Sequence, residues 1–337
     1  MPVSQPSFDA FPVGHLVLAP VISVGPVALP APGRGQDLHV RISAPLTGGD
    51  LPVLVFSHGF SASGDVYAPL TSYWAAQGFV VLAPTFLDSK TLRLPANDPR
   101  TPDIWKTRID DVGRVLDHIG ALEAVVPGLA GRIDRSRIVA VGHSFGAQTT
   151  AQLLGARTLN ADGSLGEDRS DPRVSAGVLL SAAGRGGDDL SPLAKERFPY
   201  LNQTYAEMCR PTLIVAGDKD VSPLTVRGPD WFTDAYALSP GEKALVVLFG
   251  GEHMLGGIML GGTAGVHVKE TLDEDPARVA AVQRLTTAYL KSVLRAEDPA
   301  WASARLEFEG GANPIGRVET KRDASLRMRR TGDDNAR

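Results

Sequence analysis

The chain has 337 residues, of which 43% are hydrophobic and 21% are charged, a balance typical of a globular protein with a large core. Its formal net charge of −4 gives no electrostatic reason to expect nucleic acid or an anionic membrane as a partner. Cys209 is the single cysteine, which excludes an internal disulfide and a thiolate metal cluster within this chain.

The N-terminal residues 1–20 contain neither a basic segment nor an unbroken apolar one, so they do not predict a secretory signal. No apolar run approaches the ~20 residues that a membrane-spanning helix needs. We therefore expect a cytoplasmic protein without a membrane span, and the sequence leaves its oligomeric state open.

The predicted strands change in character along the chain. Residues 1–36 are rich in Pro and Gly and predict an irregular segment with one or two edge strands, and residues 38–42 alternate as a half-buried strand does. Short continuous apolar runs follow, as in strands buried on both faces of a parallel sheet. These runs are residues 53–56, 79–82, 138–141, 178–180, 213–215 and 245–248.

Predicted helices lie between these strands, at residues 67–77, 104–122, 147–154 and 276–295. The last begins with Asp275 as N-cap and Pro276 at the first helical position. Alternating strands and helices predict a doubly wound parallel sheet. We expect an N-terminal segment at 1–36, an α/β domain at 37–300, and a C-terminal extension at 301–337 that is partly disordered, above all after Val318.

A candidate nucleophile lies in the sequence Gly142-His143-Ser144-Phe145-Gly146, which fits the G-x-S-x-G nucleophile elbow. The pattern alone is weak in a chain with 36 glycines, but a predicted strand leads directly into it and a predicted helix leads out. That strand–turn–helix context is what the motif requires, and the helix N-terminus would stabilise an oxyanion there. Ser144 is therefore the predicted nucleophile.

The predicted oxyanion hole combines two main-chain N–H groups, those of Phe60 and Phe145. Phe60 lies in Ser57-His58-Gly59-Phe60, directly after the strand at 53–56, and Phe145 follows the serine. Gly59 permits the tight turn. We interpret His58 as a residue that braces this turn by hydrogen bonding and not as the catalytic base.

The predicted acid and base each follow a later strand. Asp218 and Asp220 both lie after the strand at 213–215, and Asp220 is preferred because the chain has more room there to turn its side chain toward a histidine. Asp218 is expected to stabilise the turn itself. His253 follows the strand at 245–248, and the order Ser, Asp, His is that of the α/β hydrolases. If neither aspartate served, Asp188 or Asp189 would be the next candidates.

These residues resemble the α/β-hydrolase superfamily, and within it most closely the dienelactone hydrolase, chlorophyllase and platelet-activating-factor acetylhydrolase group. The resemblance covers roughly residues 36–295 and rests on residues 55–60, 76–81, 142–146, 211–217 with Asp220, and 251–253. It implies a mostly parallel central sheet of about eight strands with helices on both faces, and hydrolysis of carboxylic esters without metal or organic cofactor. Ser144 departs from dienelactone hydrolases proper, which use a cysteine nucleophile.

The substrate is expected to be a small to medium apolar ester. A peptidase or amidase, an acyltransferase and a non-catalytic binding protein of the same fold stay open as alternatives. Haloalkane dehalogenase chemistry is excluded because it needs a carboxylate where Ser144 stands. Residues 184–208 form a long connection that predicts either a partial lid or an ordinary surface helix. The predicted apolar wall consists of Tyr67, Trp105, Phe198, Trp231 and Met254.

Overall fold

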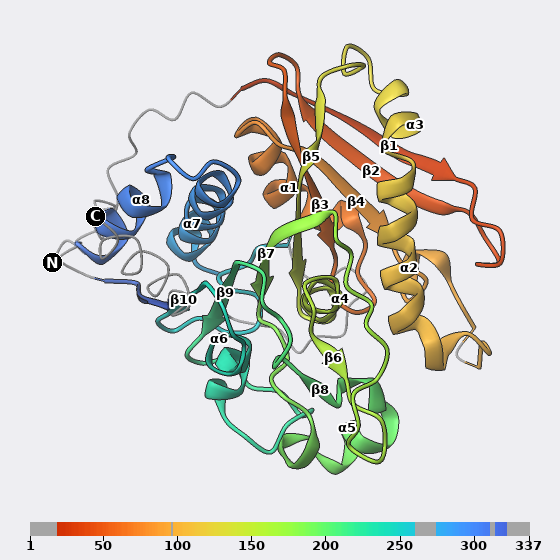
Figure 1. Ribbon diagram of the computed structural model, residues 1–337, viewed down its shortest axis with the longest axis vertical. Coiled ribbons are helices and arrows are strands. Elements are labelled where there is room, and N and C mark those ends of the chain that lie inside the picture. The colour runs from red at the N-terminus through yellow and green to blue at the C-terminus, as the bar shows by residue number, and fades with distance from the viewer. Residues whose placement is uncertain (1–18, 96, 260–273, 311–313, 322–337) are drawn as a thin grey trace, which may run out of the picture.

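A computed structural model describes residues 19–95, 97–259, 274–310 and 314–321. Nine strands form one central sheet in the order β1-β2-β4-β3-β5-β7-β9-β10-β11 (Figure 1). The five pairs from β4 to β10 are parallel, and β1, β2 and β11 add antiparallel pairs at the two edges. The strands are β1 Val21–Leu29, β2 Leu38–Pro45, β3 Leu51–Ser57, β4 Val80–Thr85, β5 Ile133–His143, β7 Val174–Leu180, β9 Thr212–Gly217, β10 Lys243–Leu248 and β11 Gly316–Lys321.

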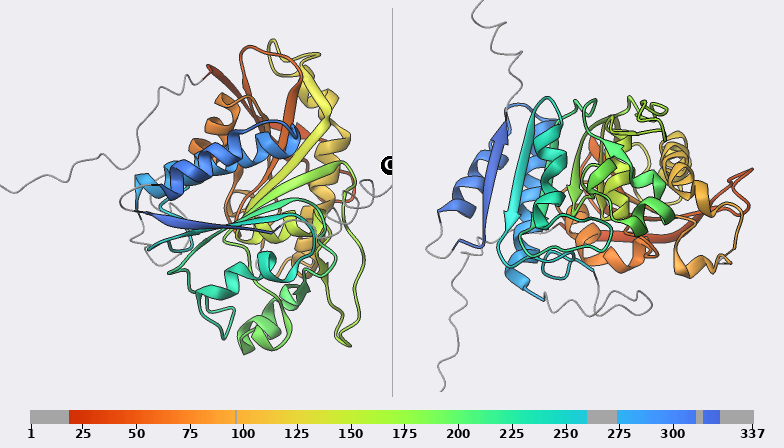
Figure 2. Two further views of the ribbon diagram at one scale, coloured as in Figure 1. Left: turned by 60° about the vertical axis from the view of Figure 1, so that its left-hand side comes forward. Right: turned by 90° about the horizontal axis from the view of Figure 1, so that it is seen from below.

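Helices cover both faces of this sheet (Figure 2). The eight α-helices in the described ranges are α1 Ala68–Ala76, α2 Ile104–Asp117, α3 Ile119–Ala124, α4 Phe145–Leu153, α5 Pro192–Arg197, α6 Asp234–Leu238, α7 Pro276–Leu294 and α8 Ala300–Glu309. Helices α2, α3, α4 and α6 contribute to the core on one face, and α1, α7 and α8 to the core on the other. The architecture is the α/β-hydrolase fold that the resemblance implied, with nine strands in place of about eight.

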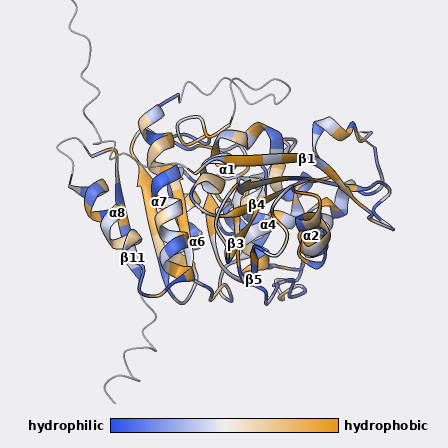
Figure 3. Cartoon of the chain, turned by 90° about the horizontal axis from the view of Figure 1, so that it is seen from above, coloured by the Kyte–Doolittle hydropathy of each residue, from blue (hydrophilic) through white to orange (hydrophobic). Residues whose placement is uncertain are grey.

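The alternation of side chains along the central strands explains why they are apolar throughout. On β3, Val53 and Val55 belong to one core, whereas Leu54 and Phe56 belong to the other. Successive side chains of a strand point to opposite faces, so a strand covered on both sides needs apolar residues at every position. Figure 3 shows this contrast, with hydrophobic strands between helices that are hydrophilic on one side.

The C-terminal part differs from the expectation. Helix α8 packs on α7, where the rings of Trp301 and Tyr289 lie 5.4 Å apart, and β11 pairs with β10. The expected poorly ordered tail after Val318 is therefore wrong for residues 319–321, which belong to the sheet. Residues 1–18 and 322–337 lie outside the described residues.

Two short strands, β6 Arg157–Thr158 and β8 Gln203–Thr204, form a separate small sheet.

The predicted start of α7 is confirmed, since the Asp275 carboxylate accepts hydrogen bonds from the N–H groups of Ala277 at 2.8 Å and Arg278 at 3.2 Å. In the described part of the chain, no helix has the length and apolar character needed to cross a bilayer.

Candidate active site

Ser144 occupies a strained turn between β5 and α4. Its φ of 55° and ψ of −120° are costly for a residue with a side chain, and its N–H is fixed by a 2.9 Å hydrogen bond to the Leu180 carbonyl. The two glycines of the motif are required by close backbone contacts. A Cβ on Gly142 would lie 2.0 Å from the Gly146 oxygen, and one on Gly146 would lie 1.9 Å from the Ser57 oxygen.

The structure brings Ser144, His253 and Asp220 into one hydrogen-bonded row, here called the triad row. Ser144 Oγ lies 2.9 Å from His253 Nε2, and His253 Nδ1 lies 2.9 Å from Asp220 Oδ2 and 3.2 Å from Oδ1. A carboxylate only accepts hydrogen bonds, so Nδ1 carries the hydrogen and Nε2 is left to accept one from the serine. Asp220 is fully buried, and the His253 side chain is 28% exposed.

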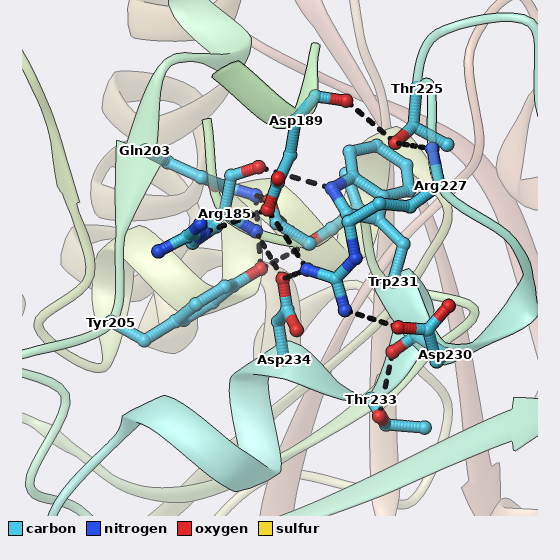
Figure 4. Close-up of polar contacts among 12 residues, drawn as sticks. Arg185, Asp189, Gln203, Tyr205, Thr225, Arg227, Asp230, Trp231, Thr233 and Asp234 are labelled. Atoms are coloured by element: carbon cyan, nitrogen blue, oxygen red, sulfur yellow. Dashed lines mark hydrogen bonds and ion pairs between the residues drawn. The ribbon is translucent and has the colours of Figure 1, made fainter. Parts of the chain in front are cut away.

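The competing carboxylates are engaged elsewhere. Asp218 Oδ1 accepts a 2.7 Å hydrogen bond from the Gly250 N–H, as a turn-stabilising residue would. Asp189 pairs with Arg185 at 2.7 Å and with Arg227 at 2.9 Å, as Figure 4 shows, and Asp188 is exposed. Of the four aspartates that the sequence analysis considered, Asp220 is the one that contacts the imidazole.

Two main-chain N–H groups, those of Phe60 and Phe145, are available beside Ser144. Neither has an acceptor among the described residues. Phe145 is the first residue of α4, where helical N–H groups have no partner within the helix and the helix dipole is positive. The N–H of Gly59, by contrast, donates to the Tyr67 hydroxyl at 3.2 Å.

His58 has the bracing contacts that the sequence analysis expected of it. Its side chain is fully buried, Nδ1 donates to the Gly59 carbonyl at 2.7 Å, and Nε2 accepts from the Phe86 N–H at 3.0 Å. Burial and the neighbouring Arg108 charge lower its pKa to about 4, so the ring is neutral at pH 7. With both nitrogens occupied, His58 has no free position for proton transfer.

Tyr67 and His143 form a second buried contact that the sequence analysis did not find. The Tyr67 hydroxyl donates to His143 Nδ1 at 2.7 Å, and His143 Nε2 donates to the carbonyl of His253 at 2.8 Å. Burial and the nearby His253 lower the pKa of His143 to about 3, and burial raises the pKa of Tyr67. This chain of hydrogen bonds connects the turn at Gly59 to the main chain of the predicted base.

The triad row opens into a cleft of ≈ 310 Å³. Tyr67 and Met254 line it as predicted, although the Tyr67 hydroxyl faces His143. The sequence analysis missed Met259 and Ala62, which lie on loops with no periodic signal. The lining residues are Gly59, Phe60, Ser61, Ala62, Tyr67, Lys90, His143, Ser144, His253, Met254 and Met259.

Three predicted wall residues do not line this cleft. Trp231 is 1% exposed, and its indole N–H donates to the Arg185 carbonyl at 3.0 Å, so it belongs to a core (Figure 4). Trp105 and Phe198 contact Tyr200 with ring centroids 6.5 Å and 6.0 Å apart. Neither ring is among the residues that line the cleft.

Hydrogen bonds, ion pairs and an aromatic contact attach the segment 184–208, the candidate lid, to the rest of the protein. Arg227 binds Asp189 within it and Asp234 outside it, each at 2.9 Å, and the Thr225 hydroxyl donates to the Asp189 carbonyl at 2.7 Å (Figure 4). Tyr200 reaches Phe145 with ring centroids 5.3 Å apart. The segment therefore contacts the elbow, and a role as a lid stays a prediction.

No group of three or more His, Cys, Asp or Glu side chains suited to hold a metal ion occurs within the described ranges. His267 lies outside these ranges. The expectation of a reaction without metal or cofactor thus stays a prediction.

Comparison with known proteins gives three matches. The sequence model of the chlorophyllase family matches residues 22–162. Platelet-activating factor acetylhydrolase of Cavia porcellus is 25% identical over 143 residues, which are 32% of this chain and 33% of that protein. Cutinase est2 of Thermobifida alba is 24% identical over 226 residues, which are 66% of this chain and 60% of the cutinase.

The chain thus spans a third of one relative and less than two thirds of the other. The chlorophyllase match includes β3, the turn at Gly59 and the elbow at Ser144, while Asp220 and His253 lie beyond it. The sheet is that of the α/β-hydrolase fold, and the sequence is similar to the chlorophyllase family, to a platelet-activating factor acetylhydrolase and to a cutinase.

Proposed function

We propose that the chain is a serine carboxylesterase that hydrolyses small to medium apolar esters through an acyl-enzyme. The observation that carries this proposal is the triad row, in which Ser144 Oγ and Asp220 Oδ2 each lie 2.9 Å from opposite nitrogens of His253. Two main-chain N–H groups beside the serine, which have no acceptor in the described part of the chain, add to it. The names of the relatives, an acetylhydrolase and a cutinase, agree with ester chemistry.

In the proposed mechanism, Ser144 Oγ attacks the ester carbonyl carbon and His253 Nε2 takes its proton. The oxyanion that forms accepts hydrogen bonds from the Phe60 and Phe145 N–H groups. His253 then gives the proton to the leaving alcohol, and water repeats the sequence on the acyl-enzyme. Asp220 holds the imidazole with its hydrogen on Nδ1 and stabilises the charged ring.

The cleft supports an apolar substrate. Its lining includes Phe60, Ala62, Met254 and Met259, and Phe60 is 53% exposed at the rim. A volume of ≈ 310 Å³ lies at the lower end of the ~300–1,000 Å³ typical of small-molecule sites, which favours small to medium esters.

The test pairs covalent labelling with a panel of substrates. An alkyl phosphonate should label Ser144 in a one-to-one ratio, and p-nitrophenyl esters of graded chain length should be hydrolysed with a preference for shorter acyl groups. The matching anilides separate an amidase from an esterase, and added alcohol as acceptor separates an acyltransferase. Absence of both labelling and ester turnover in folded protein would contradict the proposal.

A further inference from the structure

A buried ion pair lies beneath the turn that carries Phe60. Arg108 of α2 binds Asp88 through two hydrogen bonds, Nε to Oδ1 at 2.8 Å and Nη2 to Oδ2 at 2.6 Å. The two side chains are 0% and 2% exposed. Buried ion pairs lose their hydration and are often no more stabilising than apolar residues of similar volume. Stability alone therefore does not explain the Arg108–Asp88 pair, and its contacts with the turn indicate a further role.

The pair holds the turn at three main-chain atoms. Arg108 Nη1 donates to the His58 carbonyl at 2.7 Å, and Nη2 donates to the Gly59 carbonyl at 3.3 Å. Asp88 Oδ2 accepts a 3.0 Å hydrogen bond from the Ser61 N–H. Burial would raise the pKa of Asp88, but the charge and hydrogen bonds of Arg108 outweigh it and lower that pKa below its ordinary value.

These contacts determine the direction of the Phe60 N–H. The Gly59 oxygen accepts hydrogen bonds from His58 Nδ1 at 2.7 Å, from Arg108, and from the Ala62 N–H at 3.2 Å. In a trans peptide the carbonyl oxygen and the following N–H point in opposite directions. The Phe60 N–H therefore points away from Arg108.

The serine lies against this turn. A Cβ placed on Gly59 would be 3.6 Å from Ser144 Cβ, and Phe60 and Ser144 line the same cleft.

The same guanidinium contacts the residue that carries the second N–H. It lies 4.3 Å from the ring centroid of Phe145 and 4.5 Å from that of Phe86. A guanidinium stacked between two rings is attracted by both faces. Arg108 thus touches the segments that hold both N–H groups of the proposed oxyanion hole.

We propose that Arg108, held in place by Asp88, is a positioning residue that orients the Phe60 N–H and the Phe145 segment toward the oxyanion. This inference rests on the proposed function of the cleft. Arg108 reaches no substrate atom, because its own side chain is fully buried and lies behind the turn. Its effect is transmitted through the Gly59–Phe60 peptide.

Arg108→Met is the primary test, because Met fills much of the same volume without a donor. An oxyanion donor out of place typically lowers kcat by about 10²–10³-fold, and we expect a loss of that order. KM should change by less than about threefold, because the donor acts mainly in the transition state. Affinity for an alkyl boronic acid, which forms a tetrahedral adduct on the serine, should fall with kcat. Arg108→Lys, which keeps one donor for the His58 carbonyl, should be intermediate.

The chain offers a matched control in a second buried arginine–aspartate pair. Arg34 Nε lies 2.9 Å from both oxygens of Asp111, with side chains 1% and 0% exposed. Arg34 also donates to the carbonyls of Gln36, Asp37 and Thr85, none of which belongs to the oxyanion turn. Arg34→Met should lower the urea midpoint while kcat and boronate affinity stay within about threefold of wild type.

Each outcome decides one of the two proposals. Folded Arg108→Met with unchanged kcat and boronate affinity would overturn the positioning role, and so would equal loss of kcat in Arg34→Met. If Arg108→Met does not fold, Asp88→Asn is judged by the same measurements. Its amide oxygen can replace Oδ2, which accepts from Ser61 and Arg108 Nη2, but its NH2 group would then face Arg108 Nε, which needs an acceptor. Failure of the wild-type protein to hydrolyse esters or to react with a phosphonate would instead contradict the proposed function.

Discussion

Two clusters of polar side chains lie at or beside the cleft, and they differ in their exposure to solvent. The triad row reaches solvent, since the His253 side chain is 28% exposed and Ser144 is half-buried. The second group, here called the bracing cluster, consists of buried side chains only. Its members are His58, Tyr67, Asp88, Arg108 and His143, with side chains 0–2% exposed.

The difference agrees with the function proposed for each group. A proton that moves between serine, imidazole and leaving group needs side chains that substrate and water can reach. Main-chain donors that bind an oxyanion need a fixed direction, which buried hydrogen bonds provide. We therefore expect changes in the triad row to lower the rate with little effect on stability. Changes in the bracing cluster should lower stability, and should lower the rate strongly only where they displace a main-chain donor, as proposed for Arg108.

Ser144→Ala should show the largest effect of any single substitution on turnover. Removal of the nucleophile from such a triad typically lowers kcat by several orders of magnitude, on the order of 10⁶-fold in a well-studied serine protease. Stability should stay the same or rise slightly, because Ala is no more strained than Ser at a φ of 55°. Steady-state kinetics with a p-nitrophenyl ester and a urea titration measure the two quantities. A kcat within about tenfold of wild type in folded protein would rule out Ser144 as the nucleophile.

Asp220→Asn should come next, with a loss of about 10⁴-fold in kcat, because an amide disfavours the imidazole tautomer that the serine needs. Asp218→Asn is the matched control on the same turn. It should weaken only the hydrogen bond to the Gly250 N–H, cost about 0.5–1 kcal/mol of unfolding free energy, and leave kcat nearly unchanged. The reverse ranking of the two kcat values would assign the acid to Asp218.

The triad row could be predicted because its members share a position that the sequence reveals. Each follows an apolar run, and the carboxyl ends of neighbouring parallel strands meet at one edge of the sheet. The buried strands and the start of α7 were predictable for a similar reason, since apolar runs and a capping Asp275 are local signals.

Most of the bracing cluster could not be predicted from the sequence, because its contacts join residues that are far apart in the chain. Arg108 lies 50 residues from His58 and 20 from Asp88, and a charged residue on a helix is ordinarily solvated. Strand β11 was missed for a different reason. It is an edge strand in which Arg317, Glu319 and Thr320 are exposed, so it lacks the apolar run by which the central strands can be recognised.

The stability of the protein at acidic pH tests whether His58 and His143 stay neutral in the folded state. Burial lowers the pKa of His58 to about 4 and that of His143 to about 3, below the ordinary value of 6.5. From about pH 6.5 down to about pH 4, the unfolded chain binds protons that the folded chain does not, so unfolding free energy falls as pH falls. The urea midpoint should therefore be lower at about pH 5 than at about pH 7, and this difference should be smaller in the variant His143→Phe. An equal decrease in wild type and variant would contradict a neutral, buried His143.

Tyr67→Phe should have the smallest effect on turnover and a clear effect on stability, which separates the two groups most cleanly. The hydroxyl donates to His143 Nδ1 at 2.7 Å and accepts from the Gly59 N–H at 3.2 Å, so its removal leaves two buried polar groups without a partner. That change should cost about 1–3 kcal/mol of unfolding free energy. The triad row and the Arg108 contacts remain, so kcat should fall by less than about tenfold. Tyr73 provides the control, because it is half-buried on α1, the helix that begins one residue after Tyr67, and its hydroxyl has no hydrogen-bond partner in the described part of the chain. Tyr73→Phe should leave the urea midpoint unchanged; if both variants behave alike, the Tyr67 hydroxyl contributes nothing to holding the Gly59 turn against the main chain of His253.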